Sequence, residues 1–425
     1  MRIGIDGGCL ANRRGFGRFA RQLVSSLAST ENAHEWVVFV DRPSADAFQV
    51  PAPFETVLVD VGQAPTKAAS AAGRRNARDM WAMGRAVARA GLDLIYFPAT
   101  YTFFPVWNVK RVVVTMHDTL ALAHPGLVFP TWQGRVSWAL KEHAAVFWSD
   151  RIVTVSQSAR KDLIDWFRLT PERVDVITEG PNDVFRLMPA SLESSQVLQK
   201  YGIDPGSSYL LYVGGLSPHK NLGRLIEAFA RASLDAFRLV LVGDMGDVFH
   251  TQVPELKAQV DRLGLNGRVL FTGFVPDEEL VHLYNRAHAL VQPSLMEGFG
   301  LPPVESMACG TPVISSTAGS LPEVVGEAGF FFDPRNVNAI ASSLKEMCLN
   351  EDVRARLARA ALERAGRFTW SASASALLEV FAQLDPHPRS GSPGLGPHHP
   401  LRRPTSAGSA RLARQGPGER GVRGR

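Results

Sequence analysis

Cysteine is scarce in this sequence. The 425 residues include only Cys9, Cys309 and Cys348, an odd number without the short spacings of a zinc site. A disulfide framework and a cysteine-based metal site are therefore excluded as organising features. The expected compartment is the reducing cytosol.

Long apolar runs are also missing. No uninterrupted hydrophobic stretch reaches the roughly 18 to 20 residues that a membrane-spanning helix needs. Met1 and Arg2 lead directly into Ile3-Gly4-Ile5-Asp6, which predicts a first strand and no signal peptide. We therefore expect a cytoplasmic protein whose only membrane contact would be peripheral, at the inner membrane face.

Positive charge is confined to the end of the chain. The formal net charge is +5, but residues 386–425 contain eight arginines and one acid, which is +7 and leaves +5 − 7 = −2 for the rest. Without this tail, the charge gives no argument for a nucleic-acid partner. From residue 385 onward the composition of Pro, Gly, Ser, Arg and His predicts a disordered tail, which is either simply solvated or binds acidic lipid head groups or RNA.

Short strand-like segments recur along the chain in two series, with helical patterns between them. Such alternation predicts parallel βαβ units in an α/β fold. The first series is Trp36–Val40, Leu94–Phe97, Val112–Met116, Ile152–Val155 and Val174–Ile177. The second is Tyr209–Val213, Leu239–Val242, Val269–Phe271, Ala289–Val291 and Pro312–Ser315.

These two series predict two Rossmann-like domains that face each other across a cleft. We assign residues 1–186 to an N-terminal acceptor domain and residues 187–367 to a C-terminal donor domain, with a linker near 186–206. Apolar residues at helical spacing in 368–384 predict a helix that crosses back to the N-terminal domain. The disordered tail would occupy 385–425.

A glycine turn follows the strand Tyr209–Val213. Its sequence, Gly214-Gly215-Leu216-Ser217-Pro218-His219-Lys220-Asn221, leads into a predicted helix over 221–231. Backbone N–H groups in such a turn, together with the helix N-terminus, can bind an anion, and Lys220 adds a full positive charge. The alternative is an ordinary strand-to-helix turn with a surface lysine.

Two carboxylates stand eight positions apart in Glu297-Gly298-Phe299-Gly300-Leu301-Pro302-Pro303-Val304-Glu305. The two prolines suit the first turn of a helix, and Gly310 suits its end. This arrangement predicts helix-terminal N–H groups directed at a phosphate and Glu305 within reach of vicinal hydroxyls, as in nucleotide sites. The alternative for Glu305 is a solvated position on the helix.

The segment 209–334 resembles the retaining glycosyltransferases of the GT-B fold, the glycosyltransferase group 1 or family 4 proteins, which include bacterial mannosyltransferases. The resemblance rests on Gly-Gly-x4-Lys-Asn, Glu-x7-Glu, Gly273-Phe274-Val275-Pro276 and Ser320-Leu321-Pro322-Glu323-Val324-Val325-Gly326. Gly15-Phe16-Gly17-Arg18, His117-Asp118 and Val155-Ser156-Gln157-Ser158 match the family's order in the first half. The similarity covers about residues 1–384.

The resemblance implies roles for the second half. Lys220 would bind the diphosphate of the donor, and Glu305 would bind the ribose hydroxyls. Glu297 would face the donor sugar, as a catalytic residue with Lys220 and His117. Sugar and phosphate would also meet the backbone of Phe299, Gly300 and Leu301.

The resemblance implies further contacts around the donor. The loop near Val275 would line the base, and Gly15 and Gly17 would close over the phosphates from the other domain. His117 would lie under the sugar near the acceptor, at the end of a strand, where open α/β sheets bind ligands; a lone histidine is otherwise structural.

One position departs from the family. Many relatives carry an arginine where Gly215 stands in the donor site, so the motif here offers a single cation, unless His219, Arg18 or a helix dipole compensates. No Asp-x-Asp triplet occurs in the chain, which argues against metal-chelated diphosphate. No cofactor or metal is therefore expected, since the nucleotide-sugar is a substrate.

A basic stretch in the first half combines cations with apolar side chains. Lys67, Arg74, Arg75, Arg78, Arg85 and Arg89 surround Met80, Trp81 and Met83. Such a segment suits an anionic membrane surface or a polyprenyl-diphosphate-linked acceptor. Alternatively, residues 80–87 form core with a charged outer face.

The expected function is transfer of a hexose to a saccharide or lipid-linked saccharide acceptor in cell-surface glycan synthesis. The first candidate for the hexose is mannose, with GDP-mannose as the donor. The alternatives are a sugar-nucleotide epimerase on the same scaffold and a catalytically weak nucleotide-sugar-binding paralogue. Donor base and sugar, acceptor, linkage and oligomeric state do not follow from the sequence.

Overall fold

Parallel strands form two separate sheets in the computed structural model, which describes residues 1–12, 15–62, 76–129, 131–245 and 252–385. The first sheet has the strand order β3-β2-β1-β4-β5-β6-β7, and the second has the order β10-β9-β8-β11-β12-β13. The first contains β1 (Arg2–Asp6), β2 (Glu35–Val40), β3 (Glu55–Leu58), β4 (Leu94–Phe97), β5 (Arg111–Thr115), β6 (Arg151–Thr154) and β7 (Val174–Val176). The second contains β8 (Ser208–Val213), β9 (Phe237–Val242), β10 (Val269–Gly273), β11 (Ala289–Gln292), β12 (Val313–Ser316) and β13 (Gly329–Phe332).

Helices cover both faces of the first sheet, so its strands are apolar on both sides. Consecutive strand residues point to opposite faces of the sheet, so Val113 and Val114 belong to different hydrophobic clusters. One face packs against α1 (Gly15–Ser29) and α17 (Trp370–Gln383). The other packs against α4 (Ala77–Arg89), α7 (Trp132–Trp148) and α8 (Gln157–Phe167). The short helices of this half are α2 (Arg42–Ala47), α5 (Leu120–Ala123) and α6 (Pro125–Val128).

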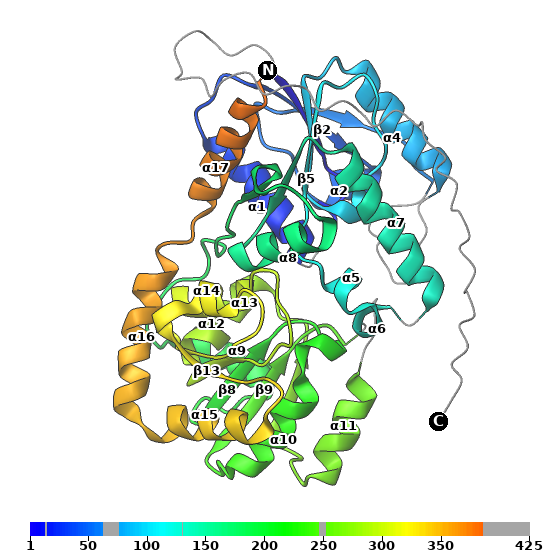
Figure 1. Cartoon of the computed structure of the whole chain (residues 1–425). Helices are drawn as coiled ribbons and strands as arrows, with labels where there is room; N and C mark the ends of the chain where they lie inside the picture. Colours follow the sequence, from blue (N-terminus) through cyan, green and yellow to red (C-terminus); the bar gives the residue numbers. More distant parts are fainter. Residues whose placement is uncertain (13–14, 63–75, 130, 246–251, 386–425) are drawn as a thin grey trace, which may run out of the picture. The chain divides into compact units, whose positions relative to one another are not determined.

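The second sheet has its own helices (Figure 1). They are α9 (Leu192–Lys200), α10 (Leu222–Ala232), α11 (Val253–Arg262), α12 (Asp277–Arg286), α13 (Leu301–Ala308), α14 (Leu321–Val325), α15 (Val337–Leu349) and α16 (Glu351–Ala365). The segment 186–206, expected to be a linker, contains α9. This helix packs against α12, with Ser194 Oγ 3.0 Å from His282 Nδ1 and Lys200 Nζ 2.7 Å from Glu279 Oε1.

The last described helix lies beside the first one (Figure 1). Trp370 of α17 meets the Phe19 ring at 5.8 Å between centroids, and Phe381 meets the Tyr96 ring at 5.7 Å. Residues 368–384 therefore return to the first sheet after the second is complete. The boundaries at 186 and 367 stay predictions, and the tail lies outside the described residues.

The basic stretch near residue 80 is a helix whose inner side belongs to the core. Met83 of α4 is fully buried and Met80 is half-buried, whereas the Trp81 side chain is 56% exposed. Arg78, Arg85 and Arg89 are exposed, and Lys67, Arg74 and Arg75 lie outside the described residues. Among the described residues, no helix has both the length and the apolar character needed to cross a bilayer.

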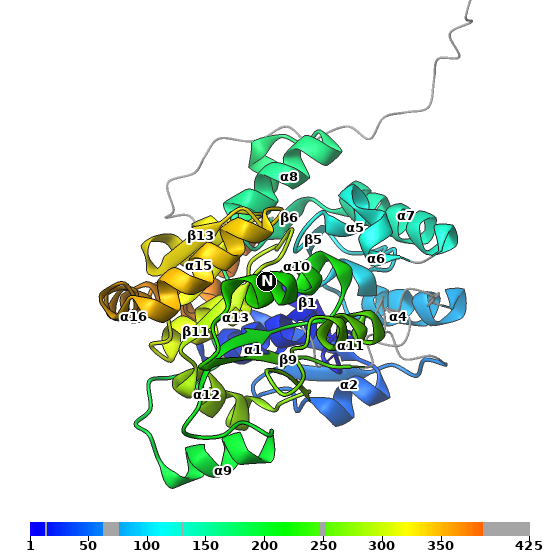
Figure 2. The same cartoon turned by 90° about the horizontal axis from the view of Figure 1, so that it is seen from below.

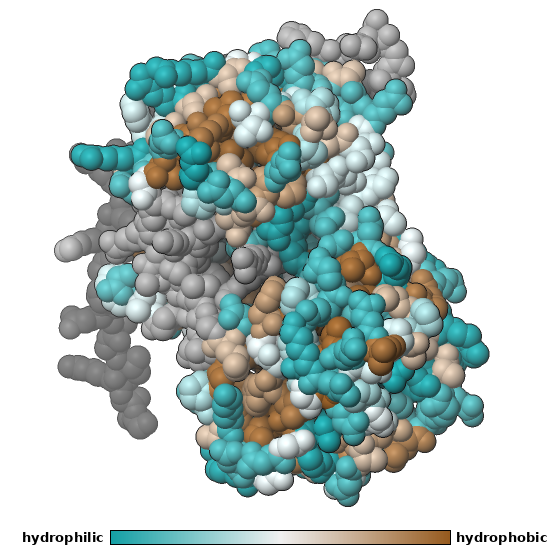
Figure 3. Space-filling model, turned by 180° about the vertical axis from the view of Figure 1, so that it is seen from behind, coloured by the Kyte–Doolittle hydropathy of each residue, from teal (hydrophilic) through white to brown (hydrophobic). Residues whose placement is uncertain are grey.

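The face seen from behind carries a hydrophobic patch on the first half and smaller ones on the second (Figure 3). Between the two halves the surface is hollowed, and hydrophilic side chains line that hollow.

Candidate active site

Lys220 and Glu297 form an ion pair at the ends of two strands of the second sheet. Lys220 ends a short 3₁₀ turn (Pro218–Lys220) after β8, and Glu297 lies in the loop that follows β11. Lys220 Nζ donates to both oxygens of the Glu297 carboxylate, at 2.7 and 2.9 Å. The two loops are also joined by the Leu295 N–H, which donates to the His219 carbonyl at 2.8 Å.

The Glu297 carboxylate is held from several sides. Gln292 Nε2 and Ser294 Oγ each donate to its Oε1 at 2.7 Å. Burial acts to raise the pKa of Glu297, but the Lys220 charge and hydrogen bond outweigh it, so the pKa lies below its usual value. Glu297 is therefore a carboxylate at neutral pH, positioned by a cation and two neutral donors.

The loop after Glu297 leads into the N-terminus of α13. Gly300 has φ 104°, which favours glycine, and no side chain among the described residues caps the helix there. Ser320 Oγ fixes the loop by donating to the carbonyls of Phe299 (2.7 Å) and Glu297 (3.1 Å). Because Pro302 and Pro303 have no N–H, the donors at this helix start are the backbone N–H groups of Gly300 and Leu301.

Glu305 lies one turn into α13 and is only 1% exposed, so it is not a solvated helix residue. Tyr284 OH donates to its Oε2 at 2.9 Å, and Arg18 Nη2 lies 2.8 Å from its Oε1. Arg18 also contacts Asp277 Oδ2 at 2.9 Å. Burial raises the pKa of Glu305, and the Arg18 charge opposes that rise.

His117 reaches this region from the first half, in the loop after β5. Its Nδ1 lies 3.4 Å from Glu179 Oε1, its Nε2 lies 3.2 Å from the Pro98 carbonyl, and its ring packs edge-on against Phe16 and Phe19. The backbone at Gly298 approaches it so closely that an added Cβ would stand 2.5 Å from the His117 carbonyl oxygen. His117 and Glu297 are therefore placed on adjoining loops of the two halves.

A second contact joins the same loops. Ser156, which begins α8 as its N-cap, donates from Oγ to the Gly298 carbonyl at 2.7 Å. The next two N–H groups, of Gln157 and Ser158, donate to the Glu323 carboxylate at 2.9 and 3.1 Å. The two halves thus meet directly around the Glu297 loop.

Comparisons with known proteins identify the family. The model described as "Glycosyltransferase Family 4" matches residues 13–183, and the one described as "Glycosyl transferases group 1" matches residues 194–364. The chain is 32% identical over 317 residues to the Escherichia coli O-antigen chain mannosyltransferase B, covering 72% of this chain and 77% of that protein. The chain belongs to the group 1 (family 4) glycosyltransferases.

Solved structures show the fold of this glycosyltransferase. Sucrose-phosphate synthase from Thermosynechococcus elongatus superimposes with a TM-score of 0.70 at 20% identity, over 90% of this chain and 99% of that one. Anabaena HepE in complex with UDP and glucose gives 0.69 at 21% identity, with the same coverage. The predicted α/β fold of the GT-B type is thereby confirmed.

The two glycines of the first half differ in their surroundings. An added Cβ on Gly17 would stand 1.8 Å from the Asn12 carbonyl oxygen, so the start of α1 accepts only glycine there. Among the described residues, nothing lies within 4 Å of a Cβ added to Gly15. A donor phosphate could therefore approach Gly15 without a steric clash. That Gly15 closes over the donor phosphates stays a prediction.

The remaining predicted donor residues have mixed surroundings. The Gly215 carbonyl accepts a hydrogen bond from Tyr212 OH at 2.6 Å. The Val275 side chain is buried, so a base could meet the backbone there or the neighbouring Phe274, which is exposed. No group of three or more His, Cys, Asp or Glu side chains in the described parts of the glycosyltransferase is arranged to hold a metal ion.

Glu305 contacts Tyr284 and Arg18, and Arg18 contacts Asp277; these contacts were not predicted from the sequence. Tyr284 and Asp277 lie on α12 and were not singled out, and Arg18 was considered only as a substitute cation for the diphosphate. The one signal was the sequence Gly15-Phe16-Gly17-Arg18, which placed an arginine at the start of α1. Its partner could not be read from spacing, because the pair joins the two halves of the chain.

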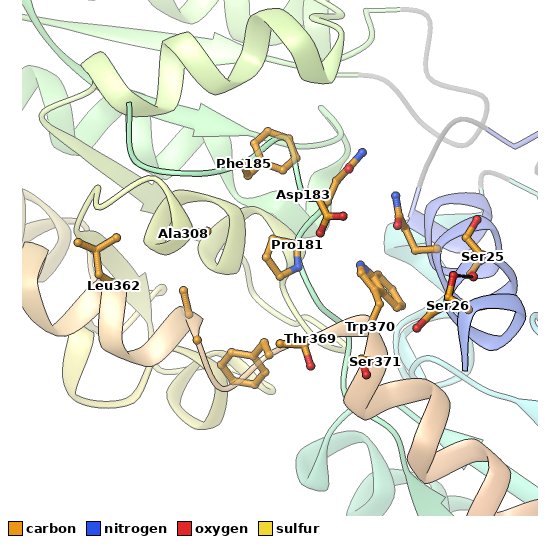
Figure 4. A pocket seen from close by; sticks show the side chains of 16 residues that line it. Ser25, Ser26, Pro181, Asp183, Phe185, Ala308, Leu362, Thr369, Trp370 and Ser371 are labelled. Carbon is orange, nitrogen blue, oxygen red and sulfur yellow. Dashed lines mark hydrogen bonds between the residues drawn. The ribbon is translucent and has the colours of Figure 1, made fainter. Parts of the chain in front are cut away.

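A cavity of about 630 Å³ lies away from this site. Residues of α1, of the segment 181–185 and of the start of α17 line it. Ser25 and Ser26 line one side, Pro181 and Phe185 another, and Trp370 lies between them (Figure 4). The predicted donor residues are not among the described side chains that line it. The cavity is therefore separate from the Lys220–Glu297 site.

Proposed function

We propose that this glycosyltransferase moves a hexose from a nucleotide-sugar to a saccharide acceptor, in cell-surface glycan synthesis. The observation that carries the proposal is the meeting of Lys220 and Glu297, whose loop adjoins His117 from the other half. Mannose from GDP-mannose is the first candidate donor, because the relative with 32% identity is described as a mannosyltransferase.

The charges suit a diphosphate leaving group. Lys220 supplies a cation, and the Gly300 and Leu301 N–H groups add the positive end of α13. One unit charge pair at about 4 Å contributes about 4 kcal/mol at an effective dielectric near 20. Such stabilisation of the departing diphosphate needs no metal, so we expect activity in the presence of a chelator.

The proposed chemical step is the one that the family resemblance implies. The bond between the anomeric carbon and the diphosphate oxygen breaks, and the acceptor hydroxyl forms a new bond to that carbon on the same face. The acceptor proton passes to the departing phosphate oxygen. Because attack and departure occur on the same face, the anomeric configuration is retained. Glu297 would face the sugar, Glu305 would accept the ribose hydroxyls, and His117 would lie on the acceptor side.

Closure of the two halves would exclude water from the reacting sugar. Around the Glu297 loop, Ser156 and the Gly298 backbone already join the halves, so the reacting groups come from both. Excluding water suppresses hydrolysis of the donor and strengthens the charge interactions. The acceptor is proposed to be a saccharide, free or linked to a polyprenyl diphosphate at a membrane surface.

One observation favours a second candidate, a nucleotide-sugar-binding protein of low catalytic activity. The diphosphate motif lacks a second cation at Gly215, and one candidate substitute, Arg18, is engaged with Glu305 and Asp277. Binding without turnover across donors and acceptors would favour this candidate.

The direct test uses the purified chain and a donor panel. Thermal shifts with GDP-, UDP-, ADP- and dTDP-sugars identify the base, and transfer from GDP-mannose to a mannose-terminated acceptor is then followed by NMR. We expect a product with the anomeric configuration of the donor, equally with and without EDTA. An inverted product, or release of a donor isomer without acceptor, would contradict the proposal.

A further inference from the structure

Helix α7 carries an apolar stripe on its solvent side. Trp132, Val136, Leu140 and Phe147 are spaced so that they share one side of the helix, and we call these four residues the α7 stripe. Three of them, Trp132, Leu140 and Phe147, are 68%, 67% and 69% exposed. The opposite side, with Ala145 and Val146, is buried against the first sheet. The α7 stripe is therefore exposed to solvent and does not contribute to the hydrophobic core.

Exposed tryptophans gather on the same layer of helices. The sequence has eight tryptophans, and the exposed ones are Trp81 on α4, Trp107, Trp132 and Trp148 on α7, and Trp166 on α8. The three helices cover one face of the first sheet (Figures 1 and 2). Trp107 packs on α4, where an added Cβ at Gly84 would meet its ring at 2.9 Å. The exposed tryptophans therefore lie on the same layer as the α7 stripe and add apolar surface to it.

The charge that α4 and α7 expose is positive. Their basic residues are Arg78, Arg85, Arg89, Arg135 and Lys141, and their acids are Asp79 and Glu142, both buried. Burial raises the pKa of Glu142 to about 8, so this side chain is largely uncharged at neutral pH. The Arg85 guanidinium lies 5.0 Å from the Trp81 ring centroid. Cations therefore lie among exposed indole rings.

We infer that the α7 stripe, together with α4 on the same face of the first sheet, docks on an anionic lipid bilayer. Tryptophan and phenylalanine side chains enter the boundary between head groups and acyl chains, while arginine and lysine pair with lipid phosphates. A helix that lies flat on a bilayer needs an apolar outer side and flanking cations, and α7 and α4 together supply both. The inference deepens the proposed function by placing a lipid-linked acceptor on the first half, yet binding to vesicles does not require transfer activity.

The test is co-sedimentation of the full chain with vesicles of phosphatidylcholine and phosphatidylglycerol, and with phosphatidylcholine alone. The variant Trp132→Ser/Leu140→Ser/Phe147→Ser should lose at least about tenfold in partitioning, because each side chain adds burial of apolar surface. The matched control Leu192→Ser/Leu349→Ser removes equally exposed leucines, 76% and 73%, from the second half. It should bind vesicles like the unaltered chain.

Charge is tested separately. Arg78→Gln/Arg85→Gln/Arg89→Gln should weaken binding to the anionic vesicles and reduce its dependence on salt, while binding to the neutral vesicles changes little. Nucleotide-induced thermal shifts should be unchanged in all these variants, which separates this inference from the proposed function. Failure of the chain to bind anionic vesicles would overturn the inference. So would stripe-dependent dimers in analytical ultracentrifugation, since the stripe would then be a protein interface.

Discussion

Arg18 Nη2 lies 2.8 Å from Oε1 of Glu305, and this ion pair joins the first helix of the chain to α13 in the second half. Glu305 is almost fully buried, and its other oxygen is occupied by Tyr284 OH. A ribose diol that binds Glu305 must therefore compete with Arg18 or share the carboxylate with it. Arg18 is thus a structural partner of Glu305.

This pair should be strongly coupled. Arg18→Ala leaves a buried carboxylate without its cation, and we expect the free energy of unfolding to fall by about 3 kcal/mol. Glu305→Gln in the Arg18→Ala background should cost little more, so a double-mutant cycle measured by chemical denaturation should be far from additive. Arg2→Ala, which removes an exposed pair with Glu35 and Glu55, is the control and should cost about 1 kcal/mol or less. Additive effects would show that Arg18 and Glu305 do not interact.

Gly17 and Gly15 provide a matched comparison at the start of α1. An alanine Cβ at Gly17 collides with the Asn12 carbonyl, so Gly17→Ala should lower the free energy of unfolding by about 2 kcal/mol or more. Gly15→Ala meets open space and should leave stability nearly unchanged. If Gly15→Ala still weakens donor binding, the loss reports a contact with the donor. Equal stability of the two variants would contradict the packing at Gly17.

Glu142 should make stability depend on pH. Its folded pKa is raised to about 8 by burial, above the ordinary glutamate value, so between these two values the folded state holds a proton that the unfolded state has lost. Stability should therefore fall as pH rises, by about 1.4 kcal/mol per unit within that window. Glu142→Gln should remove this dependence. Melting temperatures should then match near pH 5 and differ near pH 8.5, with the variant higher; parallel curves would contradict the assignment.

Much of the fold could be predicted because buried parallel strands have strong signals. Apolar runs such as Leu94–Phe97 and Tyr209–Val213 coincide with β4 and β8. The strands β3 and β13 were not predicted. The residues of β3 are largely exposed and lack a clear apolar pattern. Helix α9 was taken for a linker, since its burial depends on α12 rather than on a strong local pattern.

The positions of Lys220 and Glu297 at strand ends could be predicted from the sequence, but the side-chain pairings could not. Glycine and proline positions showed where the loops bend, so Lys220 and Glu297 could be placed at strand ends. Nothing local indicates that Lys220 bonds both oxygens of Glu297, or that Arg18 meets Glu305 and Asp277. These pairings depend on how two sheets and two halves come together, which no periodicity encodes.

We propose that Lys220 and Glu297 form one unit that acts on a diphosphate donor. We expect Lys220→Ala to lower kcat roughly 10²- to 10³-fold, as expected for loss of a group that stabilises the transition state. It should also weaken the affinity for the nucleoside diphosphate. Lys200→Ala, which removes an exposed lysine paired with Glu279, is the control and should leave both unchanged.

The most direct measurement is initial-rate transfer from the identified donor by the unaltered chain, Lys220→Ala and Lys200→Ala, with diphosphate affinity measured by calorimetry on the same samples. Our account predicts that only Lys220→Ala loses both rate and affinity. Unchanged turnover and affinity in Lys220→Ala would contradict it.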